Sequence, residues 1–587
     1  MKASLFIAKY LETKNVNYCF ELVGGMITHI LDAISQETTI SIVSFHHEQS
    51  AAFATDGVGR IKGFPSVALA TSGPGATNLI TGISSCYFDS TPAVFITGQV
   101  NTNELSSNKK GLRQLGFQET DIVSMVKPVV KYAVQVKNVD ELPIELEKVF
   151  DISISGRQGP CLIDIPMDIQ SKKIDQTKAL NFLGKKIKNN DKLISKNYKL
   201  KKDFNKLILD ITKAKKPLLL LGGGCSCASN RKISKDIIEQ LEIPVATSLM
   251  GLDVIERNNK LNVGFIGSYG NRWANRILAE ADFLLVIGSR LDIRQTGSNT
   301  NSFVEGKTIW QIDIDEAEIA NRVKPDGIII CDIKESLSYF KYFKFELKNN
   351  LLFKSNLQKW LEKIKSHKSK YPLLKEYKTT LDEINPLDFI QKLSEKLSSK
   401  TIYVTDVGQH QMWSAQSLNI KSEDRFITSG GLGAMGFGLP TAIGAAFSSP
   451  DTPIILISGD GSFQLNIQEL ETLKRNNLNI SIILFNNKCH GMVRQFQESY
   501  FKNNLQSTVK GYSTPDFGKI SRAYDISFIR SSNISYERDI NKIVENKNPL
   551  LVEVPISQKS KVYPKLAFGR KFGEMEPEFN PTSMEST

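Results

Sequence analysis

The 587-residue sequence has little cysteine, and its seven cysteines are scattered along the chain. They form no even, closely spaced set, which argues against a disulfide-stapled secreted domain and favours a reducing, cytoplasmic setting. The closest pair, Cys225 and Cys227, has no second cysteine or histidine pair nearby, so no zinc-type site is expected there. No apolar run reaches the roughly 18 residues of a membrane span.

The start of the chain also lacks the features of a secretory signal. Charges at Lys2, Lys9 and Glu12 interrupt the first stretch, MKASLFIAKYLETKN, and its apolar residues fall at helical spacing. This pattern predicts an amphipathic helix in place of a cleaved leader.

Positive charge is in excess, with a net charge of +12 and a pI near 9.0. Such a balance is compatible with binding to nucleic acid, an anionic membrane or an acidic substrate. Much of the excess lysine lies in two polar stretches, 172–203 and 345–377, which is typical of solvated linkers and surface helices. No nucleic-acid motif accompanies the charge, so neither nucleic acid nor membrane is an expected partner.

Strand-like and helical stretches alternate along three parts of the chain. Apolar runs such as SVALAT (66–71), DFLLVIGS (282–289) and ISIILF (480–485) have no polar face, which is typical of parallel strands covered on both sides. The sequence therefore predicts an α/β protein with three doubly wound parallel-sheet domains. The expected boundaries are a first domain at 1–170, a Lys-rich linker at 171–203, a middle domain at 204–340, a linker at 341–384, a third domain at 385–560 and a C-terminal tail at 561–587.

The stretch SGDGSFQLNIQELETLKRNNLNISIILFNN (458–487) places polar groups where two strands end. Asp460 lies between two glycines after the first strand, and Asn487 follows the second, so both are expected at the carboxyl edge of one sheet. A carboxylate and an amide oxygen suit Mg²⁺, which also binds phosphate oxygens. The glycines permit close approach, and a helix expected to begin near Ser462 points its N–H groups at the same anion. The pattern predicts a metal-held diphosphate.

Six further motifs carry a similarity to a known family that runs from about residue 3 to residue 570. They are HEQSAAFATDGVGR (47–60), ATSGPGATNLITGI (70–83), FQET (117–120), VATSLMG (245–251), TDVGQHQMW (405–413) and TSGGLGAMGFGLP (428–440). With these motifs the chain resembles thiamine diphosphate enzymes of the acetolactate (acetohydroxyacid) synthase large-subunit type. The resemblance implies a pyrimidine-binding first domain, an FAD-binding-type middle domain and a third domain that binds the diphosphate and Mg²⁺.

The resemblance also implies roles for single residues. Glu48 would activate the cofactor through its aminopyrimidine ring, and Phe117 and Gln118 would approach the reacting centre. Met435 would wedge the cofactor into its bent shape. The other implied diphosphate-domain contacts are Val407, Gly408, Gln409, His410, Gly433, Gly461 and Ser462, and the implied metal ligands are Asp460, Asn487 and Cys489. The family usually has Arg where this chain has His46, and that change is unassigned.

The middle domain carries several segments similar to those that bind FAD in acetolactate synthases, where the flavin does no net redox work. Glycines after an apolar strand, in GGGCS (222–226), permit close approach to a phosphate or ring. The implied FAD contacts are Gly222, Gly223, Leu249, Met250, Gly251, Arg290, Arg294, Asp313 and Asp332. A middle domain that has lost its ligand is the alternative.

Two departures suggest a divergent branch of the family. Phe496 stands where biosynthetic members usually have Trp. The smaller ring would loosen the acceptor pocket, to which Met492 also belongs. Arg494 would add positive charge near this pocket. His490 replaces the usual aliphatic residue. The second departure is FELVGGM (20–26), where a Tyr-Pro-Gly-Gly turn is usual.

The implied activity is decarboxylation of pyruvate and ligation of the two-carbon unit to a second 2-ketoacid, giving 2-acetolactate and CO₂, a step of branched-chain amino acid biosynthesis. The alternatives are transfer to another ketone such as a keto-sugar nucleotide, simple decarboxylase or oxidase chemistry, and a non-catalytic paralogue. The resemblance further implies a homodimer or tetramer with sites between subunits, and the sequence leaves open whether a regulatory small subunit binds.

Overall fold

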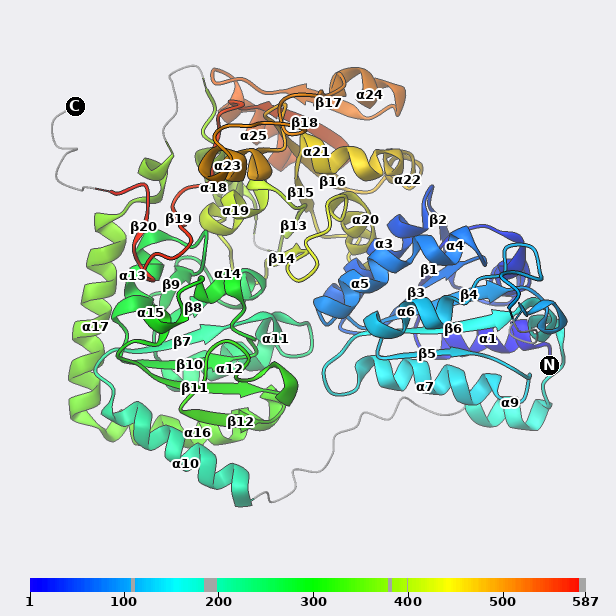
Figure 1. The fold of residues 1–587 in the computed structure, drawn as a ribbon, viewed down its shortest axis with the longest axis horizontal. Coiled ribbons are helices and arrows are strands. Elements are labelled where there is room, and N and C mark those ends of the chain that lie inside the picture. The colour runs from blue at the N-terminus through cyan, green and yellow to red at the C-terminus, as the bar shows by residue number, and fades with distance from the viewer. Residues whose placement is uncertain (107–110, 184–197, 378–382, 399, 580–587) are drawn as a thin grey trace.

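Three parallel sheets follow one another along the chain (Figure 1). The computed structural model describes residues 1–106, 111–183, 198–377, 383–398 and 400–579. Each sheet has six strands, and in each the later strands are added on both sides of the first one. This arrangement confirms the expected fold class of three doubly wound α/β domains.

The first domain has the strand order β2-β1-β3-β4-β6-β5. Its central strands are wholly buried, which explains their continuous apolar sequence. Its strands are β1 (Tyr18–Leu22), β2 (Ser41–Ser44), β3 (Ser66–Ala70), β4 (Ala93–Gln99), β5 (Tyr132–Gln135) and β6 (Pro160–Pro166). Its helices are α1 (Ala3–Thr13), α2 (Thr28–Glu37), α3 (Glu48–Lys62), α4 (Pro74–Asn78), α5 (Ile80–Phe88), α6 (Ile122–Val126), α7 (Leu142–Ile154), α8 (Met167–Ser171) and α9 (Gln176–Leu183).

The middle domain has the order β12-β11-β10-β7-β8-β9. Its strands are β7 (Pro217–Leu221), β8 (Val245–Thr247), β9 (Asn262–Phe265), β10 (Phe283–Ile287), β11 (Thr308–Asp313) and β12 (Gly327–Ile330). Its helices are α10 (Tyr198–Lys213), α11 (Gly223–Ser226), α12 (Arg231–Leu241), α13 (Arg272–Glu280), α14 (Ile293–Thr296), α15 (Thr300–Val304), α16 (Ile333–Asn349) and α17 (Leu351–Lys370).

The third domain has the order β14-β13-β15-β16-β18-β17. Its strands are β13 (Ile402–Thr405), β14 (Arg425–Thr428), β15 (Ile454–Gly459), β16 (Ile480–Asn486), β17 (Ser527–Arg530) and β18 (Leu550–Pro555). Its helices are α18 (Pro386–Lys396), α19 (Gln409–Ser417), α20 (Gly438–Ser448), α21 (Asp460–Phe463), α22 (Leu470–Arg475), α23 (Gly491–Tyr500), α24 (Phe517–Ala523) and α25 (Tyr536–Glu545).

The second lysine-rich stretch, 345–377, is largely helical, because α16 runs into it and α17 fills much of it. Phe343, Phe353 and Trp360 are buried, and the Trp360 indole donates a hydrogen bond to the Pro217 carbonyl at 3.1 Å. These apolar anchors dock the lysine-bearing helices on the middle domain. In the other stretch, residues 184–197 lie outside the described residues. Within the described chain, no helix combines the length and apolar character needed to cross a bilayer.

Helices α3 and α20 join the first domain to the third. A Cβ on Gly444 would lie 2.0 Å from the Ala54 carbonyl oxygen, and one on Gly57 would lie 2.4 Å from that of Thr441. Only glycine at both positions lets the two backbones approach so closely. Arg60 strengthens the contact by donating to the Thr428 carbonyl at 2.9 Å.

The C-terminal segment, 561–579, crosses from the third domain to the middle domain, where the short strands β19 (Lys565–Leu566) and β20 (Met575–Glu576) pair (Figure 1). The buried Arg272 holds it there by donating to the carbonyls of Met575 and Pro577, both at 2.8 Å. Glu376 balances the charge of Arg272 at 2.6 Å.

Candidate functional site

Asp460 and Asn487 meet at the carboxyl edge of the third sheet, as the sequence predicts. Asp460 begins α21 directly after β15, and Asn487 directly follows β16, which pairs with β15 in parallel. Both side chains are buried. The hydroxyl of Tyr512 donates to Asp460 Oδ2 at 3.0 Å, a contact that the sequence alone did not suggest.

The carboxyl group of Asp460 forms no ion pair with any of the described residues. Burial raises its pKa to about 7, because the charged form loses hydration. A cation beside it would restore the charged form. Among the described residues, no group of three or more His, Cys, Asp or Glu side chains gathers around a point. The donors present, one acid and one amide, suit a hard cation that takes its other ligands from a phosphate.

The amide of Asn487 has a defined orientation. Its Nδ2 donates to Gln409 Oε1 at 3.1 Å, and its Oδ1 accepts from the Cys489 N–H at 3.2 Å. The Cys489 thiol donates to the Gln558 carbonyl at 3.6 Å, and burial raises its pKa to about 11. A hard cation prefers oxygen ligands, so the main-chain carbonyl of Cys489, and not its thiol, would serve a Mg²⁺ ion here.

His410 lies near the same carboxyl edge of the third sheet, and one of its ring nitrogens has no hydrogen-bond partner among the described residues. It is 4% exposed, and burial lowers its pKa to about 3, so the imidazole is neutral. Its Nε2 is buried and has no hydrogen-bond partner in the described chain. A Cβ on Gly459 would lie 2.8 Å from Nδ1 of this ring. Such an unsatisfied buried nitrogen is a position that a bound ligand would complete.

The loop 429–438, which carries Met435, is fixed by a buried acid that the sequence analysis missed. Asp406 accepts hydrogen bonds from the N–H groups of Gly436 and Gly438, both at 3.0 Å, and from Val407 at 2.8 Å. Burial raises the pKa of Asp406 to about 6. Met435 is half-buried in this loop. The TDVG motif contains the acid, but nothing local to the motif shows that it holds a distant loop.

Two further contacts hold residues of the diphosphate segment. The Gly433 N–H donates to the Ser429 hydroxyl at 3.1 Å, and the Ser462 hydroxyl donates to the Val407 carbonyl at 3.1 Å. Asp460 is already the first residue of α21, so the helix begins two positions earlier than expected.

Glu48 is the first residue of α3 and is 7% exposed. Its Oε2 accepts a hydrogen bond from Asn78 Nδ2 at 2.9 Å, and a Cβ on Gly75 would lie 3.2 Å from its Oε1. Gln118, with φ of +65°, packs against the neighbouring Gly73. Phe117 is 80% exposed. The fold therefore gathers Glu48 and Gln118 on one side of the first domain.

Helix α23 carries Met492 and Phe496 on one face and Arg494 on the other. Phe496 is 55% exposed and contacts the Tyr500 ring, with centroids 4.9 Å apart, while Met492 is half-buried. Arg494 is 2% exposed and pairs with Glu498 at 2.5 Å. The expectation that Arg494 adds positive charge beside the acceptor is wrong, because its charge is buried and balanced.

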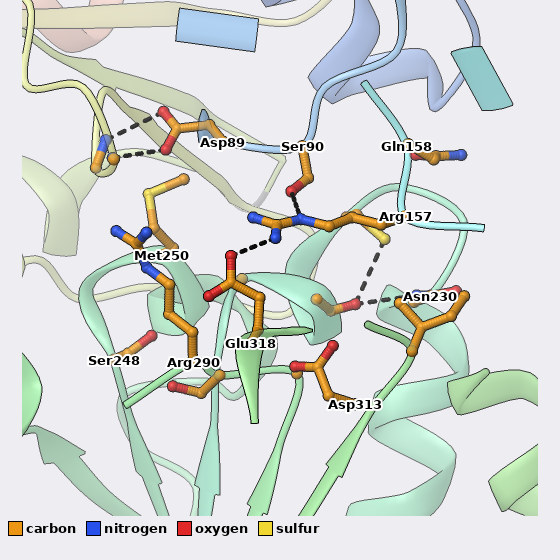
Figure 2. A pocket seen from close by; sticks show the side chains of 18 of the residues that line it. Asp89, Ser90, Arg157, Gln158, Asn230, Ser248, Met250, Arg290, Asp313 and Glu318 are labelled. Carbon is orange, nitrogen blue, oxygen red and sulfur yellow. Dashed lines mark hydrogen bonds and ion pairs between the residues drawn. The ribbon is translucent and has the colours of Figure 1, made fainter. Parts of the chain in front are cut away.

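A cavity of about 880 Å³ lies where all three domains meet (Figure 2). Its floor is the carboxyl edge of the middle sheet, the usual ligand position in such sheets. The first domain contributes Phe88 to Ser90, and the third contributes Gly430 and Gly431. The expected FAD contacts that line it are Gly223, Leu249, Met250, Arg290, Arg294, Asp313 and Asp332. Gly222 and Gly251 are not among its lining residues.

Those two glycines lie at close backbone contacts, and their implied FAD contacts stay predictions. A Cβ on Gly222 would lie 2.2 Å from the Gly288 carbonyl, and one on Gly251 would lie 2.3 Å from the Leu221 carbonyl. Asp332 caps α16 by accepting the Lys334 N–H at 2.8 Å. Burial raises the pKa of Asp313.

Arg157 of the first domain is a cavity residue that the sequence analysis missed. It reaches toward the middle domain, where it pairs with Glu318, and it donates to the Ser90 hydroxyl at 2.9 Å (Figure 2). It also pairs with Asp315 at 3.1 Å. Its segment, SGRQGP, places an arginine just before β6. An arginine at the start of a buried strand could have suggested a site residue, but the acids that it pairs with lie in the middle domain.

Comparison with known proteins gives the same three units. Models of the thiamine pyrophosphate enzyme N-terminal, central and C-terminal domains match residues 1–125, 204–340 and 406–554. Tobacco acetolactate synthase 2, chloroplastic, is 35% identical and the match covers 98% of this chain and 85% of that protein. The acetolactate synthase large subunit of Lactococcus lactis is 32% identical, with coverage of 97% and 95%. The probable large subunit of Methanococcus aeolicus is 34% identical, with coverage of 95% and 93%.

The chain belongs to the acetolactate synthase large-subunit family of thiamine pyrophosphate enzymes. This membership confirms the resemblance drawn from the sequence motifs. The N- and C-terminal thiamine pyrophosphate domain matches cover Glu48 and the Asp460–Asn487 pair, respectively. The acetolactate synthase match also runs through the middle domain and its cavity.

Proposed function

We propose that this protein decarboxylates pyruvate and joins the resulting two-carbon unit to a second 2-ketoacid, forming 2-acetolactate from two pyruvates. The carbon–carbon bond to the carboxylate breaks with release of CO₂, a new bond forms to the carbonyl carbon of the acceptor, and one proton is taken up. The observation that carries this proposal is the near-full-length match to acetolactate synthases, together with buried Asp460, Asn487 and Glu48 inside the matched thiamine pyrophosphate domains.

Thiamine diphosphate and Mg²⁺ are the proposed cofactors. Asp460, Asn487 and the Cys489 carbonyl would hold the metal, and Nε2 of His410 would contact the diphosphate with Gln409 and Gly461. The donor set fits, because a buried acid that forms no ion pair with the described residues and an unsatisfied imidazole nitrogen lie at one sheet edge. The cofactor supplies a cationic ring that accepts the electrons left by the departing CO₂.

The protein's own residues would prepare and shield this chemistry. The carboxyl group of Glu48 would hold a proton at the aminopyrimidine ring, and Asn78 keeps that carboxyl group in place. Met435 would support the bent form of the cofactor on a loop that Asp406 anchors. Phe117 and Gln118 would close over the reacting carbon, and Met492 and Phe496 would line the acceptor side.

The three-domain cavity supports FAD binding. About 880 Å³ is within the range of ligand sites, and the cavity combines arginines with an acid at strand ends. Met250 in its wall contacts Gly430, in the loop that continues to Met435, so a flavin there would adjoin the thiamine site.

The visible spectrum of purified protein, before and after added FAD, tests whether the cavity binds flavin. Arg157→Met should weaken flavin binding about tenfold, since a charged contact is lost, and a colourless protein that ignores FAD would overturn the assignment.

The substrate test uses pyruvate as the sole ketone. Purified protein with thiamine diphosphate, Mg²⁺ and FAD should form acetolactate and CO₂ in equal amounts. Release of CO₂ only after another ketone is added would overturn the assignment of acceptor.

A homodimer that completes each site with residues of both subunits is also proposed. Apolar side chains near the Glu48 face are open to solvent, with Phe117 at 80% and Val23 at 66% exposure. These side chains are available for a contact with a second subunit, which would remove them from water. The alternative of a keto-sugar nucleotide acceptor is not favoured, because Arg494 presents no free charge.

A further inference from the structure

The carbonyl oxygen of Ser560 is a buried point where three parts of the chain meet. It accepts a hydrogen bond from Gln409 Nε2 at 2.8 Å and another from Arg494 Nη2 at 2.5 Å. Gln409 begins α19 after β13, Arg494 lies on α23, and Ser560 follows β18 at the start of the C-terminal crossing. None of the three is more than 4% exposed. The contact joins the diphosphate loop, the acceptor helix and the C-terminal segment.

Arg494 can hold this carbonyl firmly because its charge is compensated. Its Nη1 pairs with Glu498 Oε1 at 2.5 Å, one helical turn away, and Lys561 Nζ lies 2.9 Å from the other oxygen of Glu498. The planar guanidinium then has a fixed direction toward Ser560. Next to it, Gln495 makes a reciprocal pair with the backbone of Val562, at 2.9 Å and 3.1 Å. Residues 560–562 are therefore pinned to α23.

The pinned carbonyl determines how the amide of Gln409 is turned. A carbonyl oxygen only accepts hydrogen bonds, so the Gln409 atom that faces it must be Nε2. Oε1 of Gln409 then faces Asn487 and accepts from its Nδ2 at 3.1 Å. This contact turns Oδ1 to the other side, where it accepts only the Cys489 N–H at 3.2 Å and keeps a second lone pair that a cation can take.

We propose that Arg494 is a positioning residue for the metal site, acting through the Ser560 carbonyl and the Gln409 amide to present Asn487 Oδ1 to the cation. The inference rests on the proposed function, because it takes Asp460 and Asn487 as the metal ligands. It gives the buried arginine of α23 a role in cofactor binding in place of a role in acceptor recognition.

The test is Mn²⁺ binding to the full-length protein, measured by electron paramagnetic resonance with thiamine diphosphate present. Arg494→Met keeps the length of the side chain and removes its hydrogen bonds, and we expect about tenfold weaker binding, as for other lost outer hydrogen bonds. Arg494→Lys can keep one partner and should give an intermediate value. Arg538→Met, on the exposed face of α25, is the matched control and should bind as the wild type does.

A double-variant cycle separates this path from a general loss of structure. Gln409→Leu should weaken Mn²⁺ binding by itself, and adding Arg494→Met should cause little further loss, because both residues act on Asn487 along one path. Independent, multiplying losses would overturn the proposal. If Arg494→Met shows no cooperative thermal unfolding, the variant is not folded, and the same cycle is measured with Arg494→Lys in its place.

The outcomes also separate this inference from the proposed function. A wild-type protein that binds no Mn²⁺ with thiamine diphosphate would overturn the metal site and with it the proposed function. A wild-type protein that binds Mn²⁺, together with an Arg494→Met variant that binds it equally well, would overturn the positioning role alone.

Discussion

Buried polar side chains at strand ends define the chemistry at the scale of single residues. Asp460, Asn487 and His410 share one edge of the third sheet, where each has lost most of its contact with water. Burial raises the pKa of Asp460 and lowers that of His410, because it disfavours the charged form of each group. A metal ion and a diphosphate, which we propose as ligands here, would supply the missing charges.

Replacing Glu48 by Gln tests the catalytic assignment. Gln keeps the shape of the side chain but cannot exchange a proton, so kcat for acetolactate formation should fall about 10²–10⁴-fold. Thiamine diphosphate binding, followed by tryptophan fluorescence, should change little. Glu37→Gln, at an exposed position at the end of α2, is the control. Undiminished turnover in Glu48→Gln would contradict the role of Glu48.

The pKa of Asp460 predicts a pH dependence of metal binding. In the metal-free protein this pKa is raised to about 7, so below that pH the cation competes with a proton. Mg²⁺ affinity should fall about tenfold per unit as the pH decreases below 7 and level off above it. Isothermal titration between pH 5.5 and 8.5 measures this. The raised pKa also affects stability. As the pH rises from the pKa of Asp460 in the unfolded chain to its pKa of about 7 in the fold, ionisation of this buried group increasingly destabilises the metal-free protein. Added Mg²⁺ should therefore stabilise the protein most at alkaline pH.

At the scale of elements, the crossing of α3 and α20 sets the position of the catalytic domains. Glu48 begins α3, and α20 follows the loop that carries Met435. The two helices approach through Gly57 and Gly444, whose missing side chains leave room for carbonyl groups of the opposite helix. The packing of two helices therefore links two candidate site residues nearly 400 positions apart.

Gly444→Ala should destabilise the protein, because its Cβ would lie 2.0 Å from the Ala54 carbonyl oxygen. Overpacking of this kind costs about 1–3 kcal/mol, which a urea midpoint can measure. Gly25→Ala is the control, since no atom lies within 4 Å of the added Cβ. Equal stability of the two variants would show that the helices separate without cost.

The long buried strands were predictable from sequence, whereas several short strands were not. Runs such as IILISG in β15 and ISIILFN in β16 are apolar throughout because they are buried on both faces. Strands β5, β12 and β17 have four residues each, lie at sheet edges and keep partly exposed side chains. Their sequences therefore carry a weaker strand pattern, and it is the neighbouring strand that decides their conformation.

At the scale of the whole molecule, the sites depend on more than one unit. The flavin-sized cavity takes its walls from all three domains. In the proposed homodimer each thiamine site would also need two subunits, because Glu48 of one subunit would meet Asp460 of another. Exposed apolar groups near Glu48, such as Phe117, are what such a contact would cover.

Mixing two inactive variants tests this assembly. Glu48→Gln and Asp460→Asn each remove one half of a site, so neither homodimer should be active. In a mixed dimer with shared sites, one site has both native residues and the other has neither, which should restore about a quarter of wild-type activity after random exchange. No recovery, with exchange verified by tagged subunits, would place both residues of a site in one chain.

The sequence by itself determined the three sheets and the residues at their carboxyl ends. Buried parallel strands leave continuous apolar runs, and the groups that follow them, such as Asp460 and Asn487, must meet at one edge. Only the tertiary structure decided that Arg157 lines a cavity shared by three domains and that Arg494 turns inward to Ser560. These contacts join residues far apart in the chain, and the pattern around either partner carries no information about the other.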